Sequence, residues 1–386
     1  MRNKELSLYI HIPFCVRKCA YCDFLSFPAD ESVKDSYTAR LCRELKEAAK
    51  DYEERKVVSI FFGGGTPSVL HADQMMRLME AVVRNYHINS DAEISIEANP
   101  GTVDTEKLRA YKKAGINRLS IGCQSLDDKE LKLLGRIHRE ADFYRAYESA
   151  RNAGIDNINT DLMSALPGQS ADSYITSLKK LIELKPEHIS AYSLIIEEGT
   201  AFYERYHSDA QIREKGGKPQ FLPDEDEERS MLYRGREILK EAAYEQYEIS
   251  NYALPGYECR HNKVYWQRGN YAGFGIGAAS CVDEWRWKNT DDIGEYLSGK
   301  KEELKKQLQQ LSPEEQRSEA AFLGLRMTRG IDIKEYSLRY GAQPAEYYGE
   351  WIDRMISEGL MILSDNKLAL SLKGQDLANY VMAGFV

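Results

Sequence analysis

Three cysteines lie close together near the start of the chain. They stand at positions 15, 19 and 22, with the spacing C-x-x-x-C-x-x-C, directly after an apolar, strand-like run at 6–12. Thiolates are soft donors that suit iron–sulfur clusters or zinc. A structural zinc site uses four protein ligands, and this loop offers no fourth. We therefore expect Cys15, Cys19 and Cys22 to hold a [4Fe–4S] cluster with one open iron. The alternatives are a zinc site and a set of reduced, half-buried thiols.

Elements that could position this loop alternate along the first 200 residues. Apolar, strand-like runs occur at 6–12, 57–62, 93–98, 118–124, 157–166 and 188–196. Helical spacing occurs between them, at 33–52, 73–85, 105–114, 141–153 and 173–184. Gly115 and Gly154 follow two of these helices as C-caps. The alternation predicts a parallel sheet, either a partial barrel or an open doubly wound sheet.

Polar residues gather where these strands end. Gly63–Gly65 and Thr66 follow the second strand, Glu97 ends the third, and Gln124 ends the fourth. Ligands of parallel α/β folds bind at this edge of the sheet. The glycines permit close backbone approach, and no Gly-Lys-Ser/Thr follows them, which disfavours a phosphate loop.

Two acidic residues near the ends of the predicted strands can be interpreted in two ways. Taken alone, Glu97 and Asp161 are as well explained as solvated turn residues as by ligand binding. Asp161 lies in an otherwise apolar run, so we expect it to be partly buried and to need a partner or a ligand hydroxyl.

The cysteine loop resembles the signature of the radical S-adenosylmethionine (SAM) superfamily. Tyr9 to Phe14 before the loop and Asp23-Phe24 after it resemble the HemW-like haem chaperones and the related oxygen-independent coproporphyrinogen dehydrogenases. The resemblance implies a partial (β/α)6 TIM-like barrel. It also implies that SAM chelates the fourth iron of the cluster, and that an electron from the cluster cleaves SAM to give a 5′-deoxyadenosyl radical.

The resemblance further assigns cluster and SAM contacts to individual positions, none of them catalytic. These are Tyr9, Tyr21, Gly64, Gly65, Thr66, Glu97, Gln124, Arg136, Asp161, Ser193 and Ala279. Arg136 lies in a Gly-Arg-Ile-His segment that resembles the family's Gly-Arg-x-His. At Ser193 the sixth strand departs from the dehydrogenase pattern Tyr-Ala-His.

The next segments depart from the strand–helix rhythm. Residues 207–223 are polar and contain glycine, and they predict a loop that leads into a helix at 227–243. The acidic run 224–228 suits the start of that helix, because its charges face the positive end of the helix dipole. Residues 244–253 predict an antiparallel extension of the sheet.

A second informative segment runs from Cys259 to Trp266. Composition alone favours a structural loop in which His261 bonds the backbone. The segment also resembles the His-Asn-x-x-Tyr-Trp motif of the haem chaperones, and this resemblance makes His261 the expected haem ligand, with Cys259 as an alternative thiolate ligand. The glycine-rich run 273–280 lacks the strand–turn–helix context of a dinucleotide site.

The chain divides into two expected domains. Residues 1–285 form the barrel with its strand extension, and residues 286–386 form a helical, winged-helix-like domain. In the second domain helical spacing covers 293–309, 314–326, 333–340 and 345–358, and a hairpin at 361–370 precedes a last helix at 372–381. No basic face is evident, so we expect a lid or a docking domain.

Composition narrows the function further. The chain has 386 residues and a net charge of −9, which argues against binding to nucleic acid or to an anionic membrane. It has no apolar run of about eighteen residues, so we expect no transmembrane helix. The first five residues are polar, and the short apolar run after them contains His11, so this run predicts a strand and not a signal peptide. We therefore expect a cytoplasmic protein whose cysteines are reduced.

We therefore expect a HemW-like protein that binds a [4Fe–4S] cluster, SAM and haem and delivers haem to apo-haemoproteins. The alternative is radical decarboxylation of coproporphyrinogen propionates, so enzymatic activity stays undecided. Phe24 stands where the dehydrogenases carry a further cysteine, and eight residues precede Tyr9 where they carry an extension. Radical modification of RNA is a third hypothesis, disfavoured by the charge. Expected partners include an electron donor such as flavodoxin or ferredoxin, a peripheral membrane surface or a second copy.

Overall fold

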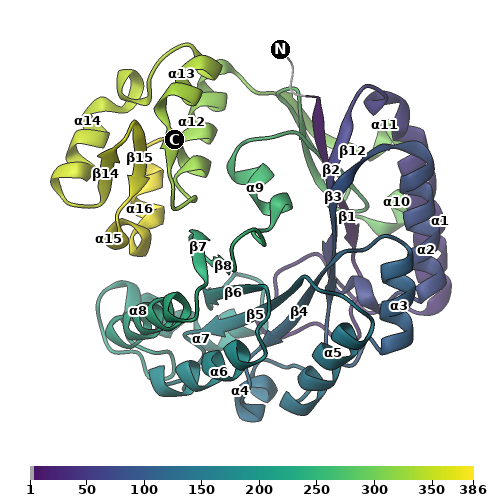
Figure 1. Ribbon diagram of the computed structural model, residues 1–386, viewed down its shortest axis with the longest axis horizontal. Helices are drawn as coiled ribbons and strands as arrows, with labels where there is room; N and C mark the ends of the chain where they lie inside the picture. Colours follow the sequence, from purple (N-terminus) through teal and green to yellow (C-terminus); the bar gives the residue numbers. More distant parts are fainter. Residues whose placement is uncertain (1–3) are drawn as a thin grey trace.

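A single curved sheet organises the molecule. The computed structural model describes residues 4–386, in which twelve strands form one sheet in the order β12-β11-β10-β9-β1-β2-β3-β4-β5-β6-β8-β7. Its central strands are parallel and form an open arc (Figure 1). They are β1 (Glu5–Ile12), β2 (Lys56–Gly64), β3 (His87–Ala98), β4 (Arg118–Gln124), β5 (Ile158–Ser164) and β6 (His188–Ser193). The partial barrel expected from the sequence is confirmed.

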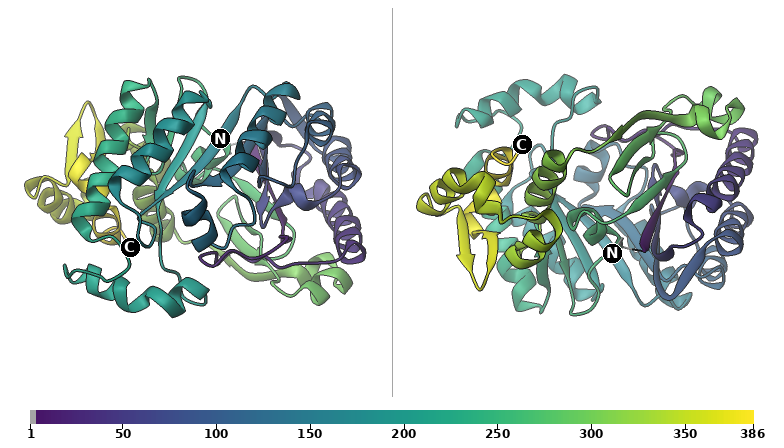
Figure 2. Two further views of the ribbon diagram at one scale, coloured as in Figure 1. Left: turned by 90° about the horizontal axis from the view of Figure 1, so that it is seen from below. Right: turned by 90° about the horizontal axis from the view of Figure 1, so that it is seen from above.

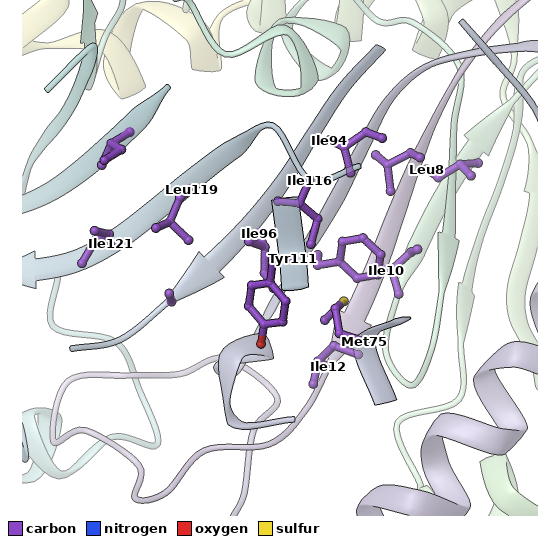
Figure 3. Packing of buried hydrophobic residues seen from close by; sticks show 14 of the residues in the cluster. Leu8, Ile10, Ile12, Met75, Ile94, Ile96, Tyr111, Ile116, Leu119 and Ile121 are labelled. Atoms are coloured by element: carbon purple, nitrogen blue, oxygen red, sulfur yellow. The ribbon is translucent and has the colours of Figure 1, made fainter. Parts of the chain in front are cut away.

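Helices cover the outer face of the arc. They are α1 (Glu31–Ala48), α2 (Ala72–Asn85), α3 (Thr105–Lys113), α4 (Asp128–Leu133), α5 (Glu140–Asn152) and α6 (Ala171–Glu183), with short 3-10 turns η1 (Ala49–Tyr52) and η2 (Pro67–Val69). Leu8, Ile10 and Ile12 of β1 point outward into a core with Met75 and Tyr111 (Figure 3). Gly115 and Gly154 follow α3 and α5 with φ of 103° and 80°, as C-caps do.

Both edges of the arc carry further strands. Beside β1 lie β9 (Tyr271–Phe274), β10 (Ala279–Val282), β11 (Trp285–Asn289) and β12 (Lys305–Gln310). Beside β6 lie β8 (Asn251–Ala253) and β7 (Glu245–Glu248), and this antiparallel extension confirms the expectation for residues 244–253.

One helix prediction needs correction. The single helix expected at 293–309 is instead α10 (Ile293–Ser298), α11 (Lys301–Leu304) and the edge strand β12. Trp287, Tyr296 and Leu304 belong to the core of the arc. Residues 286–310 therefore belong to the sheet domain, because their apolar side chains are buried there and not in the second domain.

A second correction concerns the loop expected at 207–223. Its first half is helical, as part of α7 (Ala201–Glu214), which begins at the N-cap Thr200. Phe202 and Tyr206 anchor this helix in a small cluster with Leu134 and Leu222. Polar residues occupy most of its other positions, so the sequence showed no apolar stripe. The next helix, α8 (Glu225–Glu241), begins with the acidic run as expected.

The C-terminal domain has a core of its own. It comprises α12 (Pro313–Gly324), β13 (Ile331–Asp332), α13 (Ile333–Tyr340), α14 (Pro344–Ser357), β14 (Met361–Ser364), β15 (Lys367–Leu370), α15 (Leu372–Asp376) and α16 (Ala378–Ala383). Figure 2 shows this yellow domain across the molecule from the purple helix α1. The short helix α9 (Arg260–Trp266) lies within the opening of the arc (Figure 1). Arg326 links the two units, stacking 4.3 Å from the Trp266 ring.

Candidate functional site

The inner face of the arc is polar. Along β1 the outward residues are leucine and isoleucine, whereas Ser7, Tyr9 and His11 point inward and contact polar or aromatic groups of the barrel interior. Side chains alternate between the two faces of a strand, and many inward positions of the parallel strands carry polar groups, although Phe61 of β2 also points inward. The interior is therefore built to hold polar ligands and hydrogen-bond networks, not a second apolar core.

A cleft of about 330 Å³ opens at the carboxyl ends of these strands. Its volume is within the usual range for a small-molecule site. Eleven of the residues predicted from the sequence line it. They are Cys15, Cys19, Tyr21, Cys22, Gly64, Gly65, Thr66, Glu97, Gln124, Arg136 and Asp161.

The cysteine loop is held in place by contacts from neighbouring strand ends. The hydroxyl of Thr66 lies 3.5 Å from the Cys15 sulfur, and Arg136 Nη1 donates to the Cys19 sulfur at 3.6 Å. All three thiols are free and half-buried. Among residues 4–386, no set of three or more His, Cys, Asp or Glu side chains is close enough to hold a single metal ion.

The glycine run brings β2 against the start of the cysteine loop. Gly64 has a φ of 113°, and a Cβ there would lie 2.4 Å from the His11 ring. A Cβ on Gly65 would lie 2.7 Å from the Phe14 carbonyl oxygen. Glycine is needed at Gly64 because of its positive φ and the adjacent His11 ring, and at Gly65 because the backbone of Phe14 lies so close. The amide of Gly64 also donates to Glu97 at 3.1 Å.

Two carboxylates form the acidic part of the cleft. Burial, and then the charge of Asp161, raises the pKa of Glu97 to about 8. Burial also raises the pKa of Asp161, whose carboxylate accepts from Asn159 Nδ2 at 2.7 Å. Two acids close together in a poorly hydrated site resist double ionisation. A cationic group or a ligand hydroxyl would relieve this repulsion.

Two polar atoms of the cleft have no hydrogen-bond partner within the described chain. They are Arg136 Nε and Asn251 Oδ1, both buried. Buried polar atoms are normally satisfied. A polar ligand in the cleft would supply a donor for Asn251 and an acceptor for Arg136.

The structure leaves three predicted SAM residues outside the cleft lining. Tyr9 lies in the barrel interior, where its hydroxyl is 3.1 Å from His11 Nδ1 and its ring stacks on Phe61. Ser193 faces Ser164 at 3.2 Å, on the opposite side of β6 from Tyr192, which does line the cleft. Ala279 is exposed at the start of β10 and pairs with Lys288.

His261 is enclosed in the barrel interior and lies in helix α9 instead of a loop. It is 1% exposed, and its Nδ1 and Nε2 lie 2.9 Å from the hydroxyls of Ser59 and Tyr265. Burial lowers its pKa to about 3, so the imidazole is neutral. Cys259 is also fully buried, its thiol donates to Glu93, and burial raises its pKa to about 12. Neither side chain presents a free ligand atom to the cleft.

The sequence analysis missed several polar residues of the cleft. They are Asn99, Ser120, Ser190, Tyr192, Asn251 and Asn262. Alternation from Glu97 could have found Asn99, and alternation along the sixth strand could have found Tyr192. Asn251 reaches the cleft only because β8 pairs with β6, which no local pattern shows.

Comparison with known proteins agrees with this geometry. Residues 9–181 match the Radical SAM superfamily, and residues 311–377 match the HemN C-terminal domain. The fold and the cysteine cleft are thus those of a radical SAM protein.

Two curated relatives identify the family within the radical SAM proteins. "Heme chaperone HemW" of Lactococcus lactis is 34% identical over 386 residues, covering 100% of this chain and 98% of that protein. "Heme chaperone HemW" of Escherichia coli is 43% identical over 278 residues, 72% of this chain and 70% of that protein. The chain belongs to the HemW family.

A solved structure supports the fold. Coproporphyrinogen III oxidase (HemN) of Escherichia coli, described as a radical SAM enzyme, superposes with a TM-score of 0.84 at 23% identity, covering 99% of this chain and 90% of that one. No helix among residues 4–386 is long and apolar enough to span a bilayer.

Proposed function

We propose that this protein binds haem and delivers it to apo-haemoproteins, with a [4Fe–4S] cluster and SAM bound in the cleft. The observation that carries the proposal is the full-length similarity to curated haem chaperones, at 34% identity over 386 residues. The cleft adds physical support, because its thiols, acids and unsatisfied polar atoms match the chemistry of the two cofactors.

The donors of the cleft fit a cluster and SAM. Cys15, Cys19 and Cys22 would hold three irons, and the Arg136 guanidinium donates to the Cys19 sulfur. Glu97 and Asp161 would face the amino group or the ribose hydroxyls of SAM. When bound, the cluster supplies an electron that can cleave SAM. The residues of the chain orient SAM and keep the thiolates from bulk water.

One observation separates this proposal from a coproporphyrinogen dehydrogenase. Phe24, at the position of the expected dehydrogenase cysteine, lines the cleft and is 64% exposed. A phenylalanine cannot ligate iron. We therefore favour haem binding over decarboxylation.

The test is anaerobic reconstitution with iron and sulfide, followed by titration with haem and SAM and by transfer of haem to an apo-haemoprotein. We expect haem to bind stoichiometrically and to appear in the acceptor. Absence of haem binding would overturn the proposal. Formation of protoporphyrinogen from coproporphyrinogen III would establish the dehydrogenase instead.

The haem ligand is tested separately with His261→Ala. Iron could reach Nε2 only after the Tyr265 hydroxyl leaves it. If His261 ligates haem, the variant loses affinity and its haem spectrum changes while the iron–sulfur absorbance stays. An unchanged haem spectrum would remove His261 from the proposal.

A further inference from the structure

A second hollow of about 330 Å³ lies between α9 and the C-terminal domain, apart from the cysteine cleft. We call it the interdomain pocket. Its lining comes from the end of α9, from α12 and α13, and from the turn that joins these two helices. Residues of the cysteine loop and of the strand ends do not contribute to it.

Aromatic side chains form two walls of the interdomain pocket. One is Trp266, whose ring packs against the Arg326 guanidinium at 4.3 Å. Its indole Nε1 is buried and has no hydrogen-bond partner among residues 4–386. The other wall is the pair Tyr336 and Tyr340, with ring centroids 4.8 Å apart. Flat aromatic surfaces of this kind suit a flat, conjugated ligand.

Cations stand around the same pocket. Arg329 and Lys367 are exposed, and neither side chain has a hydrogen-bond or ion-pair partner in the described part of the chain. Arg339 uses its guanidinium to donate to the carbonyls of Gln267 and Arg268, at 3.1 and 2.7 Å, and so joins α13 to the end of α9.

Acids in the lining do not neutralise these cations. The Asp332 carboxylate accepts from the amides of Lys334 and Glu335 at the start of α13 and serves as its N-cap. The Glu335 side chain is exposed. Although the whole protein has a net charge of −9, cations outnumber acids in this lining, with Arg329, Arg339 and Lys367 against Asp332 and Glu335. This excess favours an anionic ligand.

A neighbouring hollow extends the site. It measures about 370 Å³ and shares Gln267, Arg329, Glu335 and Arg339 with the interdomain pocket. Arg329 and Arg339 therefore border both hollows. The combined space suits a ligand that is larger than one pocket and carries more than one acid group.

We propose that the interdomain pocket receives the propionate-bearing edge of haem. Trp266 and the two tyrosines would contact the porphyrin ring, and Arg329 and Lys367 would pair with its carboxylates. Trp266 belongs to the same helix as His261 and lines the pocket, whereas His261 does not. This inference rests on the proposed haem function and assigns the haem to a site separate from the cluster and SAM.

The test compares three probes on the full-length, reconstituted protein: haem, iron-free protoporphyrin IX and haem dimethyl ester. In Arg329→Gln/Lys367→Gln we expect the Kd for haem and for protoporphyrin IX to rise roughly tenfold, since charge-assisted hydrogen bonds are lost. The ester should bind the unmodified protein about as weakly as haem binds the variant. The control Lys240→Gln/Lys373→Gln makes the same charge change at exposed sites outside the pocket and should bind haem normally.

The outcomes separate the two proposals. If the unmodified protein binds no haem, the proposed function fails. If the unmodified protein binds haem, but the double variant binds haem with the same Kd and the unmodified protein binds the ester as tightly as haem, the pocket assignment is wrong and the haem function stands. Equal losses in the variant and in the control would show a general charge effect and would also overturn the assignment. Unchanged iron–sulfur absorbance in every variant shows that the cysteine cleft is intact, and an unchanged denaturant unfolding curve shows that the fold is intact.

Discussion

The barrel interior has an upper half, the cleft at the carboxyl ends of the strands around the cysteine loop, and a lower half around His261; the same strands build both, but different groups occupy them. In the lower half, α9 fills the arc: Glu93 accepts from the amides of Arg260 and His261, each at 3.0 Å. The upper half is the cleft, to which α9 contributes Asn262, and Arg136 and Asn251 keep unpartnered buried atoms there. The comparison indicates that the lower half stabilises the fold, whereas the upper half is left open for ligands.

The largest effect is expected from removing a cluster thiol. Cys19→Ser should abolish the iron–sulfur absorbance and SAM binding together, because the cluster would lose one of three protein ligands and the partner of Arg136. Anaerobic absorbance and a SAM-binding assay measure both. Cys42→Ser, in α1 and outside the cleft, is the matched control and should leave both unchanged. A cluster that survives in Cys19→Ser would remove the upper half as the cluster site.

Substitutions in the lower half should change the stability of the protein and not its cofactor content. Glu93→Ala removes the acceptor for the first amides of α9 and a negative charge near the buried Arg118. Leaving a buried charge uncompensated should lower the free energy of unfolding by about 3 kcal/mol. Denaturant unfolding measures this, and Asp91→Ala, on the same strand but exposed, is the control. Equal stability of the two variants would show that the network is not structural.

The acids of the upper half predict a pH dependence in the ligand-free protein. The unfolded chain loses the Glu97 proton near 4.5, whereas the folded chain keeps it to about 8. Unfolding therefore releases a proton within that window, and stability falls as the pH rises through it, by about 1 kcal/mol per pH unit. Glu97→Gln should flatten this slope in denaturant unfolding measured across the window. A slope that is the same in both proteins would show that Glu97 titrates normally.

The site residues differ in how far the sequence could predict them. The cysteine loop and the glycine run were found because each is a local pattern next to the end of a strand, whereas the position of Glu97 left two interpretations open and the family resemblance assigned it. Ser193 and His261 were assigned from motif resemblance, which does not show which face of a strand or helix a side chain occupies. In β6 the alternation from Ser190 brings Tyr192 to the cleft and turns Ser193 away.

The features that the sequence did not predict depend on contacts between segments that are far apart in the chain. Asn251 lines the cleft because β8 pairs antiparallel with β6, and β12 joins the sheet through β11. Helix α7 has few apolar residues, so its periodicity gave no signal, although Thr200 is a recognisable N-cap. The interdomain pocket requires two units to meet, and no stretch of sequence contains that information.

The smallest effect tests which face of β6 meets SAM. The Tyr192 hydroxyl donates to Gln124 Oε1 at 3.0 Å and holds that side chain at the cleft, where Gln124 has a φ of 69°. Tyr192→Phe removes one neutral hydrogen bond of about 1 kcal/mol, so the Kd for SAM should rise roughly fivefold. Ser193→Ala removes a hydroxyl of similar polarity on the opposite face and should leave the Kd unchanged. Anaerobic equilibrium dialysis with the reconstituted variants compares the two, and a larger loss in Ser193→Ala would show that the motif resemblance, and not the strand alternation seen here, identifies the SAM contact.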